Sequence, residues 1–268
     1  TLIKPIIEGM KISLQSMSGS AAERELHRMD TDMSTKSVML TFAVILVGLV
    51  ITFWDFVSAV PISAGLMWTL VVVGVVVALL IGFFVAAACG YMAGLIGTSA
   101  SPISGIGILA TIISSLVVYF IASENNLFAT EAGVQFATAM AIFMTSVVIA
   151  IASISNDNLQ DLKTGQLVGA TPWRQQIALL LGSVAGAVAI APVLNLLYQA
   201  YGFTGALPRA EMDPNAALSA PQATLMTTIA QGIFNSSMDW NYILIGVVVG
   251  IVAIIVNVIL KSTTASLT

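Results

Sequence analysis

Long apolar runs with almost no charged residue recur along this sequence. A helix needs roughly 20 apolar residues to cross a bilayer core of about 30 Å, because each residue adds about 1.5 Å. Six runs reach that length, at residues 38–56, 66–89, 103–122, 133–153, 175–200 and 241–260. We therefore predict an all-α protein, a polytopic transmembrane helix bundle of about six spans with one or two broken or re-entrant segments.

The composition supports a membrane protein and excludes several other classes. Hydrophobic residues make up 58% of the chain and charged residues 8%, against about 25% charged residues in soluble domains. The single histidine, His27, lies in a polar segment, and the single cysteine, Cys89, lies in an apolar run. The sequence has no HExxH or GxSxG motif. We expect no enzyme activity, catalytic residue, metal site, cofactor or nucleic-acid partner.

Basic residues separate the loops into two groups. If the six spans alternate and the polar segment 10–37 is cytoplasmic, eight of the nine Lys and Arg residues lie inside and only Arg209 lies outside. This asymmetry follows the positive-inside rule. It predicts cytoplasmic loops at 10–37 and 154–172 and opposite loops at 123–132 and 201–220. It also requires that the apolar but broken segment 215–237 does not cross the bilayer.

The chain divides into two parts on this interpretation. Residues 1–37 form a chain end and a cytoplasmic loop, and residues 38–268 form a transmembrane helical domain. The sequence starts with Thr1 rather than methionine and stops in a polar stretch soon after the sixth run. We therefore expect a fragment of a longer chain.

The segment 97–107 is rich in residues that interrupt helices. Non-helical backbone cannot face lipid, so we expect this break to line a cavity enclosed by protein, where hydroxyls and free amides can contact a ligand. The alternative is a kinked helix in a packed bundle. The residues concerned are Gly97, Thr98, Ser99, Ser101, Pro102, Ser104, Gly105 and Gly107.

Local signals predict a short cytoplasmic helix between the fourth and fifth spans. Asp157 can cap it together with Gln160, Gly165 suits its end, and Pro172 can begin the next helix. Glycine pairs four residues apart predict close helix packing. These pairs are Gly90 with Gly94, Gly182 with Gly186, and Gly246 with Gly250.

Three stretches together resemble a known family. GYMAGLIGTSASPISGIGI, NDNLQDLKTGQLVGATPWRQQ and LSAPQATLM are similar, in this order, to the second half of the oligopeptide transporter (OPT) family, especially its prokaryotic and yellow-stripe-like members. The resemblance implies a proton-coupled importer built as two related halves, with the first half as a missing partner. Ser101 stands where the family usually has asparagine before the proline.

Our functional hypothesis is a proton-coupled secondary transporter that imports short peptides or peptide-like metal chelates across the cytoplasmic (inner) membrane. The alternative is a passive channel with a hydroxyl-lined filter. Polar residues within apolar runs extend the candidate site, although for Asn195, after Pro192, an interhelical hydrogen bond is the competing role. Candidate proton-coupling residues are Asp157 and Asp161. Candidate substrate-binding residues are Tyr91, Ser99, Ser101, Ser104, Gly105, Asn195 and Gln222.

Overall fold

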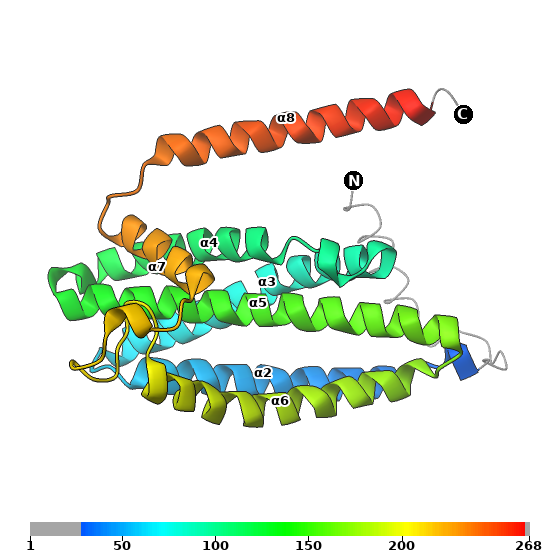
Figure 1. The fold of residues 1–268 in the computed structure, drawn as a ribbon, viewed down its shortest axis with the longest axis horizontal. Helices are drawn as coiled ribbons and strands as arrows, with labels where there is room; N and C mark the ends of the chain where they lie inside the picture. The colour runs from blue at the N-terminus through cyan, green and yellow to red at the C-terminus, as the bar shows by residue number, and fades with distance from the viewer. Residues whose placement is uncertain (1–27, 266–268) are drawn as a thin grey trace.

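The computed structural model describes residues 28–265, with side chains up to residue 260, and this part of the chain is helical (Figure 1). Six helices are long and apolar enough to cross a membrane, which confirms the predicted fold class. The described elements are the 3-10 helices η1 (Arg28–Asp30), η2 (Thr98–Ala100), η3 (Leu127–Ala129) and η4 (Pro214–Ala216), and the α-helices α2 (Thr35–Ser58), α3 (Ala64–Ile96), α4 (Ile103–Glu124), α5 (Glu131–Val168), α6 (Pro172–Tyr201), α7 (Pro221–Phe234) and α8 (Trp240–Ala265).

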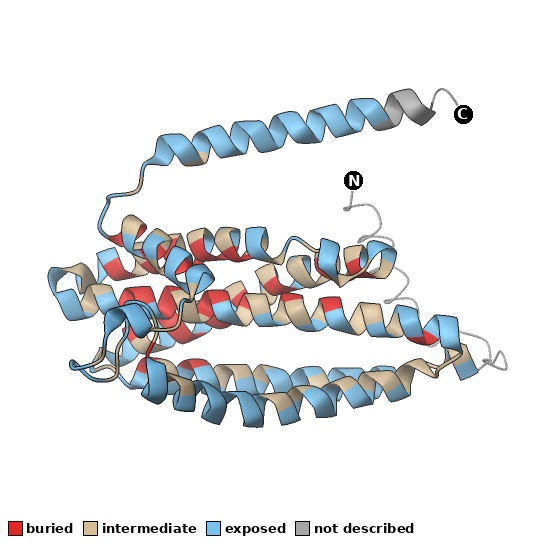
Figure 2. Cartoon of the chain, viewed as in Figure 1, coloured by how far each residue is buried: buried red, intermediate tan, exposed pale blue. Residues whose placement is uncertain are grey.

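The buried residues gather where α3, α4, α5 and α7 meet (Figure 2). Helix α5 lies at the centre and contacts α3, α4, α6 and α7. Helix α2 joins this core through Phe53, which is fully buried and meets Phe143 of α5 edge to face, with ring centroids 5.0 Å apart. Large apolar side chains on both helices therefore bury surface where the two helices approach each other.

Three glycines of α3 allow neighbouring helices to come close. A Cβ atom added at Gly74 would lie 2.5 Å from a ring carbon of Phe53, and one at Gly82 would lie 2.6 Å from Ile151. At Gly90 the added atom would lie 2.8 Å from the hydroxyl of Ser155. Of the predicted glycine pairs, only Gly90 has such a neighbour, so packing by the pairs on α6 and α8 stays a prediction.

The predicted short helix between the fourth and fifth spans is wrong. Helix α5 runs without interruption from Glu131 to Val168, so Asp157 lies inside it rather than capping a new helix. The helix ends at Gly169, whose φ of 76° is left-handed, and not at Gly165. Of these local predictions, only the start of the following helix is correct, because Pro172 lies in the first turn of α6.

The connections lie at two opposite ends of the bundle (Figure 1). At one end the turn between α5 and α6 contacts the segment after η1, where the amide of Trp173 donates to the carbonyl of Thr31 at 3.3 Å. At the other end the turns 59–63 and 125–130 line one cavity. This arrangement fits alternating spans. The sidedness stays a prediction, and most of the loop 10–37, with His27, lies outside the described residues.

Helix α7 is too short to be a span. Its 14 residues extend about 21 Å, less than a bilayer core of about 30 Å, which agrees with the prediction that segment 215–237 does not cross. Helix α7 packs on α4 and α5, whereas α8 stands apart from the bundle (Figure 1). Helix α6 has no buried residue in this chain, and neither do the described side chains of α8.

Candidate functional site

The predicted break is present and is shorter than the sequence indicated. Helix α3 ends at Ile96, Gly97 follows with a left-handed φ of 91°, and α4 begins at Ile103 just after Pro102. Ser104 and Gly105 therefore belong to the first turn of α4. No positive φ is recorded at Gly105, and a Cβ atom there would meet nothing within 4 Å, so Gly97 is the position in this segment that requires glycine.

Two amide side chains of α5 hold the non-helical backbone of the break. Asn156, 3% exposed, accepts a hydrogen bond from the Ser101 hydroxyl at 2.5 Å and donates to the Thr98 carbonyl at 3.5 Å. The oxygen of Gln160 accepts from the Thr98 amide at 2.9 Å. We call Asn156 and Gln160 the amide clamp. It satisfies backbone groups that a break in a helix leaves open.

A second polar contact joins the start of α4 to the start of α7. The amide nitrogen of Gln222 donates to the hydroxyl of Ser104 at 3.3 Å, across 118 residues of sequence. Both residues line a cavity of about 450 Å³ whose remaining wall comes from α5 and α7. We call it the α4–α7 cavity, and its other lining residues are Ile103, Ile142, Thr145, Ser146, Ile149, Ala223 and Met226.

The α4–α7 cavity receives two helix N-termini. Neither α4 nor α7 has a side-chain cap, and the first main-chain amides of any helix have no acceptor within that helix. Helix N-termini carry partial positive charge and favour anionic groups. No charged side chain is among the described residues that line the cavity. Attraction of an anionic group to this cavity would therefore depend on the main-chain amides at the two helix starts.

The amide clamp and the α4–α7 cavity lie at different heights along α5. Thr145 and Ile149 lie about 21 to 27 Å from the first residue of α5, and the clamp lies about 37 to 44 Å from it. The break is therefore closer to the end that carries the turn between α5 and α6. Candidate residues that are neighbours in the sequence thus separate, with Ser101 at the clamp and Ser104 at the cavity, whereas Gly105 lines neither.

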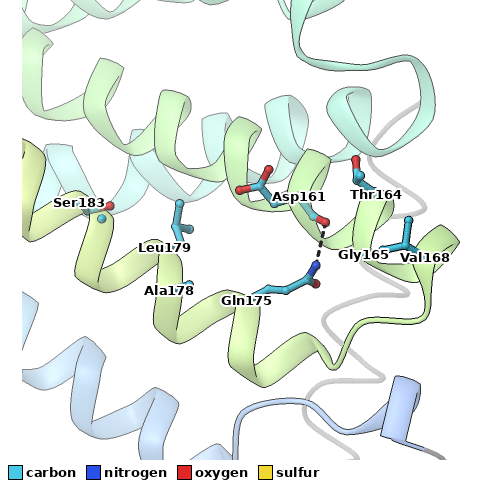
Figure 3. A pocket seen from close by; sticks show the side chains of 9 residues that line it. Asp161, Thr164, Gly165, Val168, Gln175, Ala178, Leu179 and Ser183 are labelled. Carbon is cyan, nitrogen blue, oxygen red and sulfur yellow. Dashed lines mark hydrogen bonds between the residues drawn. The ribbon is translucent and has the colours of Figure 1, made fainter.

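The two candidate proton-coupling carboxylates are exposed on α5. Asp161 lines a cavity of about 610 Å³ between the end of α5 and the start of α6. Figure 3 shows its side chain in this cavity, while its main-chain carbonyl accepts a hydrogen bond from the Gln175 side chain at 3.3 Å. Asp157 is not among the lining residues. Asp161 is thus the carboxylate with an adjacent space that a ligand or water can enter.

The remaining candidates are dispersed. Ser99 is exposed in η2, and Tyr91 is exposed on α3 before the break. Asn195 lies exposed on α6, one turn after Pro192, and lines none of the cavities described here. The structure of this chain therefore brings together Ser104 and Gln222, but not Tyr91, Gly105 or Asn195.

The residues that sequence reasoning missed are on α5. Asn156 and Gln160 are one helical turn apart, and a pair of amides four residues apart on one helix face is a signal for a shared partner. That signal was obscured because Asp157 between them is also a good capping residue. Thr145 gave no comparable signal, because a single threonine in an apolar run can bond to its own helix. Its hydroxyl does so here, donating to the carbonyl of Ala141 at 2.8 Å.

Comparison with known proteins gives one family. A family model described as OPT oligopeptide transporter protein matches residues 1–268. A Haemophilus influenzae protein named "Putative oligopeptide transporter" is 55% identical over 260 residues, which are 97% of this chain and 41% of that protein. The chain thus spans less than half the length of this curated relative. No solved structure matches.

Proposed function

Because this chain belongs to the OPT oligopeptide transporter family, we propose that it forms part of a proton-coupled secondary transporter. Its cargo is short peptides or peptide-like metal chelates, imported across the cytoplasmic membrane. Six candidate spans and the name of the Haemophilus influenzae relative support membrane transport of peptides. The observation that carries the proposed site is the convergence of two uncapped helix starts at the α4–α7 cavity.

The α4–α7 cavity suits one end of a peptide. Every peptide ends in a carboxylate, and the amides at the start of α4 and α7 offer donors to such a group without the need for a basic side chain. Ser104 and Gln222 add a hydroxyl and an amide that fix the orientation of the bound end. Apolar residues such as Ile149 and Met226 form much of the wall and exclude water from these contacts.

The test of the site is uptake by the full-length transporter with Ser104→Leu, with Ser104→Ala as the conservative control. Ser104 is exposed, so a larger side chain has room and the fold should persist. We expect Ser104→Leu to reduce the initial rate of peptide uptake at least tenfold and Ser104→Ala to reduce it much less. Monodisperse yield in detergent reports folding. Normal uptake by a well-folded Ser104→Leu protein would remove Ser104 from the substrate path.

Proton coupling is tested separately from binding. A protonophore should abolish accumulation of peptide against its gradient, because one charge moved through about 100 mV supplies about 2.3 kcal/mol. We assign the coupling role first to Asp161 because of its cavity. Asp161→Asn should keep exchange of labelled peptide across proteoliposomes but lose accumulation, with Asp157→Asn measured in parallel. Full accumulation by Asp161→Asn would place the coupling group elsewhere.

A further inference from the structure

A second cavity continues the α4–α7 cavity along α7. Its volume is about 490 Å³, and it shares Ile142 and Ser146 with the first cavity. We call it the outer cavity, because it lies nearer the first residue of α5. Its lining residues are Phe56, Gln135, Thr138, Ala139, Ile142, Phe143, Ser146, Thr227 and Gln231. Together the two cavities form one groove between α5 and α7.

The groove follows single faces of both helices. Along α5 its walls include Gln135, Thr138, Ile142, Ser146 and Ile149, at the three- and four-residue steps that place side chains on one side of a helix. Along α7 the first turn borders the α4–α7 cavity and the last turns border the outer cavity. Helix α7 therefore runs antiparallel to α5, and the groove extends for most of its length.

The side chains of the outer cavity have one chemical character. Gln135, Thr138, Ser146, Thr227 and Gln231 are uncharged, and each has a hydroxyl or an amide. No charged residue is among the described residues that line either cavity. Uncharged amides and hydroxyls match the N–H and C=O groups of a peptide backbone, which are the same for every peptide sequence.

Apolar surface lies beside these polar groups. Phe56 and Phe143 stack with ring centroids 4.4 Å apart, and both border the outer cavity. Side chains of a bound peptide alternate in direction along an extended backbone, so some of them would pack on these rings. Such contacts are non-directional and tolerate many side chains.

The length of the groove sets the size of the ligand. From Gln222 to Gln231 along α7 the axial distance is about 14 Å, which is the span of about four residues of extended peptide. A dipeptide spans about 7 Å and fits within the α4–α7 cavity alone. We propose that the outer cavity binds the backbone of residues beyond the anchored end, and that Thr227 and Gln231 thereby raise the affinity for a tetrapeptide relative to a dipeptide. This inference rests on the proposed peptide transport.

The test compares Thr227→Leu with Thr228→Leu in the full-length transporter in proteoliposomes. Both threonines bond to the carbonyl four residues earlier at 2.9 Å, but only Thr227 borders the groove. Gln231→Leu is a second variant on an exposed position, which removes the amide at similar size. The measured quantities are KM for an alanine dipeptide and an alanine tetrapeptide, with monodisperse yield as the folding control.

We expect Thr227→Leu and Gln231→Leu to raise the tetrapeptide KM about fivefold relative to the dipeptide KM, which corresponds to about 1 kcal/mol. Thr228→Leu should leave the ratio unchanged. An unchanged ratio in both groove variants would overturn the assignment of the outer cavity and leave peptide transport standing. If the unmodified transporter accumulates neither peptide, the proposed transport of short peptides fails, and the inference fails with it.

Discussion

Removal of the Asn156 side chain should loosen the break between α3 and α4. Asn156 is 3% exposed and bonds to both Ser101 and Thr98, so Asn156→Ala leaves a hydroxyl and a carbonyl without their partner. Interhelical hydrogen bonds in membrane proteins average about 0.6 kcal/mol and reach about 1.7. Two lost bonds and a small cavity together suggest a local destabilisation of about 1 to 2 kcal/mol.

The assay is hydrogen–deuterium exchange of the full-length protein, read on peptides that cover residues 97–102. If exchange proceeds through local opening, 1 to 2 kcal/mol corresponds to exchange faster by about 5- to 30-fold. The control is Asn158→Ala, the same residue type two positions along α5 and outside the described contacts of the break. It should leave exchange in this segment unchanged.

A double-mutant cycle isolates the contact between Asn156 and Ser101. Because the two side chains bond directly, Ser101→Ala should add little in a protein that already carries Asn156→Ala, and the coupling should be about 1 kcal/mol. Equal exchange in Asn156→Ala and wild type would refute the clamp. Strictly additive effects would show that Ser101 acts independently of Asn156.

Two further predictions follow from packing and topology. Gly74→Ala should lower the stability of the full-length protein in detergent by about 1 to 3 kcal/mol, because the new Cβ would lie 2.5 Å from the buried ring of Phe53. The control is Gly65→Ala on the same helix, whose Cβ would meet nothing within 4 Å and which should not destabilise the protein. Equal melting temperatures for the two variants would contradict this packing. In a background without the native cysteine, a single cysteine at Asn126 and one at Lys163 should react with a membrane-impermeant reagent from opposite faces of the membrane. Labelling of both positions from the same face would exclude the alternating six-span topology.

The break and the helix count could be predicted from the sequence because both depend on local chemistry. Apolar runs of about 20 residues have few alternatives to a helix that buries its own backbone bonds. Gly97 ends α3 because glycine readily adopts a left-handed φ, and Pro102 precedes α4 because proline has no N–H to donate. Both effects are confined to a few neighbouring residues. These features require no knowledge of what packs against them.

Tertiary structure decided how the polar residues are used. The sequence around Asp157 is compatible with a cap or with a continuing helix. In the structure α5 continues, and Asn156 and Gln160 bond across the bundle to the break. Packing also separates Ser101 from Ser104, and it brings Ser104 to Gln222 across 118 residues. Local sequence determines where a helix can begin or end. The pairing of polar groups in hydrogen bonds depends on how helices that are distant in the sequence pack together. Packing removes water and lipid from these groups, and a buried polar group without a hydrogen-bond partner is costly.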